Sequence, residues 1–245
     1  MQRLDSLLFE RGMFASREKA RRAVMAGLIE VEGRLVDKPG TAVRGEARLA
    51  VRGAGEPFAS RAGRKLAAAL DHFGLDPRGS ICLDIGASTG GFTDCLLQNG
   101  AGRVYAVDVG YGQLDQRLRE DPRVIVMERV NARYLEPDSI NEEIQLVTID
   151  VSFISLTKIV PAVLPMLAND GWLLPLIKPQ FEAGKGKVGK GGIVRDVEFR
   201  RQVIDETVEA LEAVGLQCHS CFDSPVVGSK GNREAFALFQ RGNER

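Results

Sequence analysis

The chain has 245 residues, of which 44% are hydrophobic and 27% are charged, and its formal net charge is zero. These values are typical of a soluble globular protein with one large domain or two smaller ones. A membrane-spanning chain is excluded, because no apolar run reaches the roughly 18–20 residues that cross a bilayer. The first residues lack the apolar core of a secretion signal, so we expect a cytoplasmic protein.

The charge is distributed unevenly along the chain. Residues 1–64 contain 13 Lys and Arg against 8 Asp and Glu, a net charge of +5, and the remaining residues carry −5. A compact basic module joined to a mildly acidic one indicates that the first module binds a polyanion.

The N-terminal region predicts two short helices followed by a hairpin. The first helix has an apolar face made of Leu4, Leu7, Leu8 and Phe9. The second begins after Ser16, a favourable N-cap residue, and ends at Gly27. Its apolar face contains Ala20, Ala23 and Val24. Residues 28–36 alternate in polarity and turn at Glu32-Gly33, which predicts the hairpin.

A glycine-rich tract at 50–57 separates this region from the rest of the chain. We therefore predict a first domain at 1–55, a linker at 56–63 and a second domain at 64–245. In the second domain, strand-like and helix-like segments alternate, which predicts a parallel sheet with helices on both faces. The predicted strands are 81–86, 103–108, 123–127, 145–150 and 171–177, the predicted helices include 64–73, 92–98, 155–168 and 197–214, and the last strands, 216–222 and 234–240, would form an antiparallel pair.

The four cysteines are too few for a disulfide scaffold in a chain of this length. Cys218-His219-Ser220-Cys221 resembles half a zinc site, but a second pair with ligand spacing is missing. Alternation with Leu216 and Phe222 favours a strand. We therefore interpret the cysteines as free thiols and predict no metal.

The most informative segment is Leu83-Asp84-Ile85-Gly86-Ala87-Ser88-Thr89-Gly90-Gly91-Phe92. A buried strand ends there in a glycine-rich turn, and a helix begins after it. This arrangement brings backbone N–H groups and a helix N-terminus close to a ligand. The next strand ends in Asp108, where a carboxylate can bind the two hydroxyls of a ribose. The segment therefore predicts a site for a nucleoside-containing cofactor.

The spacing of the glycines favours S-adenosylmethionine over NAD. Ser88 stands where the dinucleotide motif has the glycine that lets a pyrophosphate approach. Asp84 is also a poor neighbour for phosphates but suits a ligand with ammonium and sulfonium groups. The same letters spell the nucleophile elbow of α/β-hydrolases, Gly86-x-Ser88-x-Gly90. That alternative needs a histidine after the serine, and the only such histidine, His219, lies in a strand-like segment.

Two charged residues follow apolar runs of the predicted sheet. Asp150 ends the fourth strand, and Lys178 ends the fifth. Charges near a buried rim are costly unless they are paired, so the two residues form either a structural or a catalytic ion pair. Their place beside the cofactor turn favours catalysis.

The N-terminal region resembles the S4 domain, a small α+β fold that binds structured RNA. The resemblance covers about the first fifty residues and rests on Arg3-Leu4-Asp5, Arg11-Gly12, Ser16-Arg17-Glu18-Lys19-Ala20, Gly27, Val31, Gly33 and Lys38-Pro39-Gly40. It implies that basic side chains contact phosphates, which supply affinity and position rather than sequence specificity. The expected RNA-binding residues here are Arg3, Arg11, Arg17, Lys19, Arg21, Arg22 and Lys38.

Nearly the whole chain resembles the TlyA family, in which an S4 domain precedes an FtsJ-like ribose methyltransferase. The resemblance rests on the segments 58–66, 150–156, 178–182, 190–196 and 231–236 and on the glycine turn. It implies an α/β fold, a Rossmann-like class I methyltransferase with a small N-terminal RNA-binding domain. The catalytic Lys-Asp-Lys-Glu tetrad of FtsJ-like enzymes maps onto Lys65, Asp150, Lys178 and Glu234. Ala62 departs from the family pattern, where we expect a glycine.

The resemblance also implies the ligands and the substrate. The expected cofactor is S-adenosylmethionine, bound by Asp84, Gly86, Ala87, Ser88, Thr89, Gly90, Phe92, Asp108, Val109, Asn131 and Asp150. Asn131 replaces an acid that related enzymes often place near the adenine. The expected substrate is a ribose 2′-hydroxyl of ribosomal RNA, with cytidines as candidates, in ribosomal subunits. Further RNA contacts are expected from Arg61, Arg64, Lys185, Lys187 and Lys190, the last three in a glycine- and lysine-rich loop read as a substrate-contacting lid.

In the expected reaction, Lys178 is the proton acceptor or stabilises the oxyanion, and Asp150 is next in importance. Lys65 supplies a second positive charge, and Glu234 with Asp150 orients the two amines. A lysine amine can act as a base only in its neutral form. No metal and no membrane are required, and a monomer is expected.

Three alternatives remain open from the sequence. The first is a membrane-active protein, because sequences of this family have carried haemolysin labels. The second is an RNA-binding protein without catalysis, and the third is a pseudouridine synthase, because S4 domains also precede those enzymes. The glycine turn has no role in pseudouridine chemistry.

Overall fold

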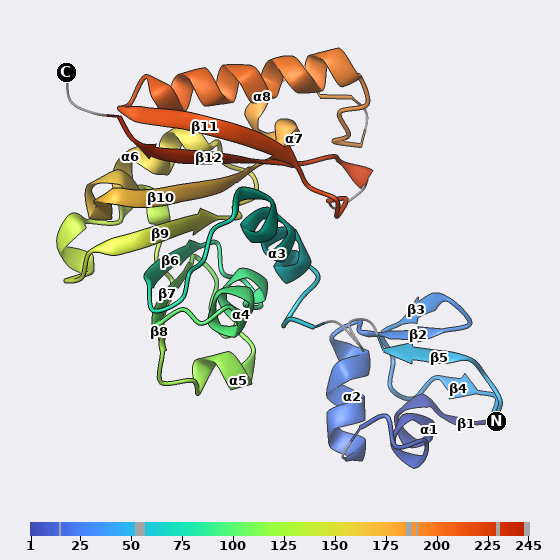
Figure 1. The fold of residues 1–245 in the computed structure, drawn as a ribbon. Coiled ribbons are helices and arrows are strands. Elements are labelled where there is room, and N and C mark those ends of the chain that lie inside the picture. Colours follow the sequence, from blue (N-terminus) through green and yellow to red (C-terminus); the bar gives the residue numbers. More distant parts are fainter. Residues whose placement is uncertain (15, 52–56, 185–187, 190, 229–230, 243–245) are drawn as a thin grey trace. The chain divides into compact units, whose positions relative to one another are not determined.

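The structure is a computed structural model that describes residues 1–14, 16–51, 57–184, 188–189, 191–228 and 231–242 (Figure 1). The chain divides into two compact units, Met1–Glu56 and Pro57–Arg245. Each unit has its own hydrophobic core.

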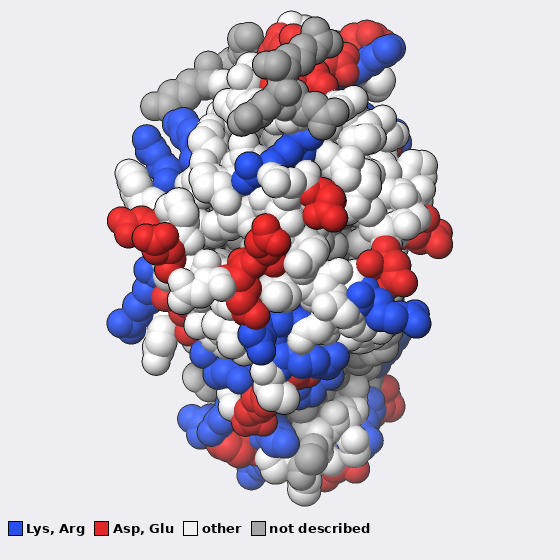
Figure 2. All heavy atoms as spheres, turned by 60° about the vertical axis from the view of Figure 1, so that its left-hand side comes forward, with Lys and Arg blue, Asp and Glu red and all other residues white. Residues whose placement is uncertain are grey.

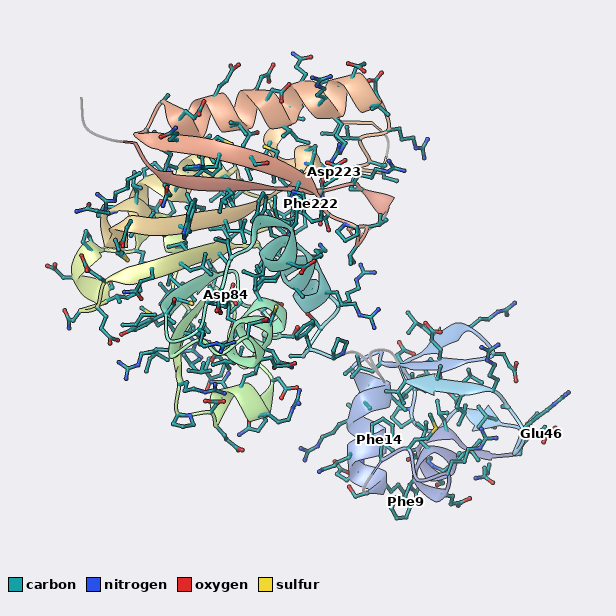
Figure 3. All side chains as sticks on the ribbon, viewed as in Figure 1. Phe9, Phe14, Glu46, Asp84, Phe222 and Asp223 are labelled. Atoms are coloured by element: carbon teal, nitrogen blue, oxygen red, sulfur yellow. The ribbon has the colours of Figure 1, made fainter. Side chains whose placement is uncertain are left out.

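The N-terminal unit combines two helices with short strands. Its elements are β1 (Gln2–Arg3), α1 (Leu4–Glu10), α2 (Arg17–Met25), β2 (Ile29–Val31), β3 (Arg34–Val36), β4 (Ala42–Val43) and β5 (Leu49–Val51). Strands β3, β2 and β5 form one antiparallel sheet, and β1 pairs with β4. The core contains Leu4, Leu7, Leu8, Ala20, Ala23, Val24 and Ile29, as the helical spacing predicted for the helix residues. Phe9 is an exception, because its side chain is 45% exposed on α1 (Figure 3).

The ends of α2 follow the predicted chemistry. The Ser16 side chain accepts a hydrogen bond of 3.2 Å from the Lys19 backbone N–H, which caps the first turn. Gly27, with a φ of +67°, ends the helix in the left-handed conformation. Glu32 and Gly33 also have positive φ values, as the tight turn of the β2–β3 hairpin requires.

The C-terminal unit is a sheet covered by helices on both faces. Its helices are α3 (Ala62–Phe73), α4 (Gly91–Gln98), α5 (Gln116–Arg119), α6 (Val160–Val163), α7 (Pro179–Glu182) and α8 (Val197–Glu212). Its strands are β6 (Ile81–Ile85), β7 (Arg103–Asp108), β8 (Val124–Glu128), β9 (Ile144–Ile149), β10 (Leu167–Ile177), β11 (Leu216–Asp223) and β12 (Ala235–Arg241). The strand order is β11-β12-β10-β9-β6-β7-β8.

Strands β6 to β10 are parallel, and β12 pairs antiparallel with both β10 and β11. Core side chains from α3 and α4 pack on one face of the sheet, and those from α6 and α8 pack on the other. This arrangement confirms the predicted α/β fold. The carboxyl ends of the parallel strands meet at one edge, which is where ligands bind in sheets of this kind.

The predicted helix over 155–168 is wrong. The segment forms a 3₁₀ turn at Leu156–Lys158, the short helix α6 and another 3₁₀ turn at Leu164–Met166, and β10 already begins at Leu167. Pro161 and Pro165 explain the interruption, because a proline has no N–H to continue a helix. Further 3₁₀ turns lie at Ala132–Tyr134 and Pro137–Ser139.

The boundaries around the predicted linker also differ from the expectation. Helix α3 begins at Ala62, so 62 and 63 belong to a helix, and β5 includes 50 and 51. Gly63 lies against α4, since a Cβ there would be 2.7 Å from the carbonyl oxygen of Gly91. That close approach needs Gly63 rather than a glycine at 62.

Among the residues that the structure describes, no helix is long and apolar enough to cross a membrane. In the same part of the chain, no group of three or more His, Cys, Asp or Glu side chains is arranged to hold a metal ion. Cys218 and Cys221 lie on β11, the strand that the alternation predicted.

Candidate active site

The turn after β6 packs so closely against the end of β9 that it requires a glycine at position 86. Gly86 has a φ of +86°, and a Cβ there would lie 2.5 Å from the backbone oxygen of Asp150. Gly90 has a φ of +94°, and a Cβ there would lie 2.2 Å from Cδ1 of Leu118. Both positions therefore need glycine. The turn therefore packs closely against the end of β9 on one side and against Leu118 on the other.

Two adjoining cavities open at this edge of the sheet, with volumes of about 510 and 180 Å³. They share Gly86, Ser88, Asp150 and Ser152 as lining residues. The predicted cofactor residues that line the larger cavity are Gly86, Ser88, Asp108, Val109, Asn131 and Asp150, and Ala87, Thr89 and Phe92 line the smaller one. Gly90 lines neither cavity and shapes the turn instead. A cavity of this larger size can hold a nucleoside.

Asp84 does not lie where the sequence prediction put it. Its side chain is fully buried below the turn, at the end of β6, and lines neither cavity (Figure 3). Its carboxylate accepts hydrogen bonds from the hydroxyls of Thr93 at 2.6 Å and Thr148 at 3.2 Å. Burial raises the pKa of Asp84 to about 7. The residue therefore connects α4 and β9 to β6 through its hydrogen bonds.

Asp108 is oriented by backbone donors at the mouth of the larger cavity. Its Oδ2 accepts from the Ser88 N–H at 2.8 Å, and its Oδ1 accepts from the Gly110 N–H at 2.7 Å. Each carboxylate oxygen has a second lone pair that a ligand hydroxyl can use. The Asn131 side chain accepts from the Arg133 N–H at 3.1 Å, and Val130 and Ala132 beside it supply apolar wall. This end of the cavity fits a ribose and a flat base.

The four predicted catalytic residues form two ion pairs. Lys178 Nζ lies 2.5 Å from Asp150 Oδ1, and Lys65 Nζ lies 2.5 Å from Glu234 Oε2. Both lysines and Glu234 are less than a tenth exposed. The strand register brings the pairs to the same edge of the sheet, because Ile177 of β10 is opposite Ala235 of β12. Their charges are therefore paired, as buried charges require.

One of these pairs lines the two cavities described above. Lys178 and Asp150 line the smaller cavity, and Asp150 lines the larger one as well. Lys178 Nζ also donates to Ser152 Oγ at 3.2 Å. Lys65 and Glu234 line neither cavity. Asp150 and Lys178 can therefore contact a molecule bound in the smaller cavity. The Lys65–Glu234 pair lies at the same edge of the sheet.

The sequence interpretation missed an exposed aromatic residue at the cavity rim. Phe153 is 90% exposed, has a φ of +65° and lines the larger cavity. A positive φ is unfavourable for a bulky side chain and is often found at functional sites. Its ring centroid is 4.9 Å from that of Phe181. The signal available in the sequence was the position of Phe153, directly after Ser152 and three residues after Asp150.

Two further missed residues hold loops at this edge. Glu182 accepts from the Leu156 N–H at 2.9 Å, and burial raises the pKa of its carboxyl. Asn232 is 2% exposed and bonds the backbone of Gly192 and Val194. These contacts fix the loop that carries Phe153 and the segment that precedes α8.

The predicted RNA-binding residues differ in their surroundings. Arg3 donates to Asp5 at 2.9 Å, and Arg17 lies 3.5 Å from the same carboxylate. Arg11 donates to the carbonyl oxygens of Ala47, at 2.7 Å, and of Gly45. The Arg11 guanidinium therefore stabilises the loop at residues 45–47, and these hydrogen bonds compete with contacts to RNA.

The other predicted RNA contacts are exposed where the structure describes them. Arg22 forms an exposed pair with Glu18 at 3.5 Å, and Lys19, Arg21, Lys38, Arg61 and Arg64 are exposed as well. Figure 2 shows Lys and Arg side chains, mixed with some Asp and Glu, gathered in the lower part of the visible face. The predictions for Lys185, Lys187 and Lys190 lie outside the described residues.

Comparison with known proteins agrees with this geometry. Residues 58–241 match the model of the FtsJ-like methyltransferases. The chain belongs to this family. Residues 2–49 match the S4 domain. The FtsJ-like part contains the sheet, the glycine turn and both ion pairs, so the predicted fold and family are confirmed.

Relatives share both parts of the chain. The 16S/23S rRNA (cytidine-2′-O)-methyltransferase TlyA of Mycobacterium tuberculosis is 42% identical over 99% of this chain and 91% of its own length. Hemolysin A of Brachyspira hyodysenteriae is 42% identical over 97% of this chain and 99% of its own length. A solved structure from Streptococcus thermophilus with a provisional hemolysin name has a TM-score of 0.77 and 42% identity, and covers 99% of this chain and 89% of that one.

Proposed function

We propose that this chain transfers a methyl group from S-adenosylmethionine to the 2′-hydroxyl of cytidines in ribosomal RNA. The observation that carries the proposal is the Lys178–Asp150 ion pair, which lines the smaller cavity and whose Asp150 also lines the larger one. The name of the Mycobacterium tuberculosis relative supports the choice of RNA and nucleotide. Ribosomal RNA as substrate implies work in the cytoplasm.

The larger cavity fits the cofactor by its chemistry. Asp108 can accept hydrogen bonds from ribose hydroxyls, and Val130 and Ala132 line the cavity beside Asn131, which can bond the edge of a base. Gly86 lines both cavities and lets the turn pack against the end of β9, next to Asp150. When bound, S-adenosylmethionine supplies an electrophilic methyl group on a sulfonium. The residues of the turn would hold that methyl close to Asp150.

The ion pair would activate the acceptor. An alcohol is a weak nucleophile at neutral pH, so negative charge that develops on its oxygen has to be stabilised. Lys178 Nζ already engages Asp150 and Ser152, and an amine held in this way can bond the hydroxyl oxygen of a substrate. The cofactor, held by the glycine-rich turn and Asp108, would supply the methyl group, and the electron pair of its carbon–sulfur bond would stay on sulfur. The charged Lys178 would stabilise the acceptor oxygen, and the hydroxyl proton would pass to the Lys178–Asp150 pair, with the Asp150 carboxylate as its acceptor.

The remaining residues would support this step. Lys65 and Glu234 would balance the charge beside the reacting pair. Phe153 would stack on the base of the target nucleotide, because an exposed ring offers a face that any base can use. The S4 domain would bind phosphates through exposed residues such as Lys19 and Arg21.

A second RNA surface would include two exposed tyrosines that lie close in sequence to the cavity residues Val109 and Asn131. Tyr111 and Tyr134 are 70% and 69% exposed, and each has an arginine over its ring, Arg129 at 4.2 Å and Arg133 at 5.4 Å. Exposed rings with attached guanidinium groups suit RNA bases and phosphates.

The test compares Lys178→Ala with wild type on ribosomal subunits and naked ribosomal RNA. Ribose methylation would be mapped by mass spectrometry of RNA digests. We expect methylated cytidines with wild type, and a rate at least a hundredfold lower with Lys178→Ala while calorimetry still detects cofactor binding. Lys158→Ala, which changes an exposed lysine, is the control. Unchanged turnover in Lys178→Ala would refute the assigned role.

The hemolysin names belong to relatives and need a separate assay. Release of dye from liposomes by the purified chain, at concentrations that saturate methylation, would favour membrane activity over the proposal. We expect no release.

A further inference from the structure

We propose that Gln113 is a cofactor-binding residue that, together with Asp108, clamps the two ribose hydroxyls of the nucleoside. This inference rests on the proposed function. It adds a cofactor-binding residue that neither the glycine-rich turn nor Asp108 predicts. Gln113 lies in the loop between β7 and α5 and lines the larger cavity together with Asp108 and Ser88.

The Gln113 amide is oriented towards Asp108. The Oε1 of Gln113 accepts a hydrogen bond of 3.4 Å from the Ser88 hydroxyl. A Cβ on residue 110 would lie 2.0 Å from Gln113 Nε2 and 3.0 Å from Asp108 Oδ1, so these two atoms are neighbours across Gly110. The amide nitrogen occupies the space that a side chain at 110 would fill. Gly110 is therefore needed for the amide to reach the cavity.

The pair offers complementary chemistry to a vicinal diol. A carboxylate oxygen accepts a hydrogen from one hydroxyl, and an amide N–H donates to the oxygen of the other. Asp108 alone can only accept, and its two oxygens are already fixed by the Ser88 and Gly110 N–H groups. A neutral donor next to this carboxylate would tell a ribose with both hydroxyls from a deoxyribose.

The loop that carries Gln113 is tied to the cofactor turn. The Asp115 N–H donates to the Thr89 backbone oxygen at 3.2 Å. Leu114, which is buried, lies against Gly90, since a Cβ at 90 would be 2.9 Å from its Cδ1. These contacts hold Gln113 at the mouth of the cavity and reduce the entropy that binding would otherwise cost.

The experiment measures the dissociation constant of S-adenosylhomocysteine by calorimetry for four proteins. These are wild type, Gln113→Ala, Gln113→Glu and the control Gln116→Ala. Gln116 is exposed, and its Nε2 donates to Glu120 at 2.6 Å, so its replacement removes the same side chain from a neighbouring position. Gln113→Glu keeps the acceptor for Ser88 but loses the amide donor.

We expect Gln113→Ala and Gln113→Glu to weaken binding about 3- to 10-fold, the usual loss for one hydrogen bond, and Gln116→Ala to bind as wild type does. The control Gln116→Ala should keep its methylation rate at saturating cofactor within twofold of wild type. A second probe set consists of the 2′-deoxy and 3′-deoxy forms of S-adenosylhomocysteine. Wild type should lose affinity for both, whereas Gln113→Ala should be insensitive to the loss of one of them.

The outcomes separate the inference from the proposed function. If wild type binds no S-adenosylhomocysteine, the proposed function fails. If wild type binds it and Gln113→Ala binds equally well, or loses affinity equally for both deoxy probes, the role of Gln113 is refuted while the proposed function stands.

Discussion

Replacing Asp84 by Asn should make the stability of the C-terminal unit less sensitive to pH. The Asp84 carboxyl is fully buried, and burial raises its pKa from 3.8 to about 7. The negative charge of Asp150 raises this pKa further, and the hydroxyl hydrogen bonds of Thr93 and Thr148 lower it. An acid whose pKa is raised by folding stabilises the folded state when it is protonated. That contribution is full below the unfolded pKa of 3.8 and is lost as the pH rises towards 7.

The size of the effect follows from the two pKa values. A difference of about three units corresponds to about 4 kcal/mol at high pH, since one unit is 1.36 kcal/mol. Between pH 4.5 and 7.5, the free energy of unfolding of wild type should fall by about 3 kcal/mol relative to Asp84→Asn. The comparison with the variant removes the contributions of all other groups, which titrate in both proteins.

The assay is urea unfolding at several pH values between 4.5 and 7.5, followed by the fluorescence of Trp172. This residue is the one tryptophan of the chain and lies on β10, so it reports on the C-terminal unit. Asp76→Asn is the control, because it makes the same chemical change at a side chain that is 67% exposed. A stability difference between Asp84→Asn and wild type that does not grow with pH would show that the carboxyl is not protonated near neutrality.

Two further predictions concern the contacts with RNA. Phe153→Ala should raise the KM for RNA about 5- to 10-fold through the loss of stacking, and Phe153→Trp should restore it, with the dissociation constant of S-adenosylhomocysteine within twofold of wild type. Steady-state kinetics on ribosomal subunits would measure this, and an unchanged KM in Phe153→Ala would remove Phe153 from the substrate site. The double replacement of Lys19 and Arg21 by Ala should weaken RNA binding and lower the slope of log affinity against log salt by about 2, because two phosphate contacts are lost. Filter binding at several salt concentrations tests this, and a slope equal to that of wild type would exclude both residues from phosphate contact.

Local patterns predicted most of the sheet and the cofactor turn. Apolar runs that end in Asp108 or Asp150 identified the strands, because a buried parallel strand needs continuous apolar residues. The geometry of Gly86 was also predictable, since its spacing marks a tight turn after a strand. The predicted helix over 155–168 is wrong because the apolar spacing of the segment is helical while its two prolines, which carry no N–H, interrupt the helix.

Other features depend on contacts between distant parts of the chain. The partners Lys65 and Glu234 are separated by 169 positions, so only the family resemblance connected them. Asp84 was predicted to bind the cofactor because the sequence does not show that its carboxylate is buried and accepts a hydrogen bond from Thr148 on another strand. Phe153 was missed because neither its positive φ nor its exposure at the cavity can be seen in the order of the residues around it.

The two ion pairs differ in what their loss would mean. Lys178 and Asp150 line a cavity, so removing either one takes away a group that can touch substrate. Lys65 and Glu234 line neither cavity, and removal of one leaves a charge that is buried without a partner, which commonly costs 3–5 kcal/mol. Lost activity in a Lys65 variant would therefore follow from a disturbed fold as readily as from lost chemistry. A catalytic contribution of the second pair has to be judged on variants that change Lys65 and Glu234 together and keep the charge balanced.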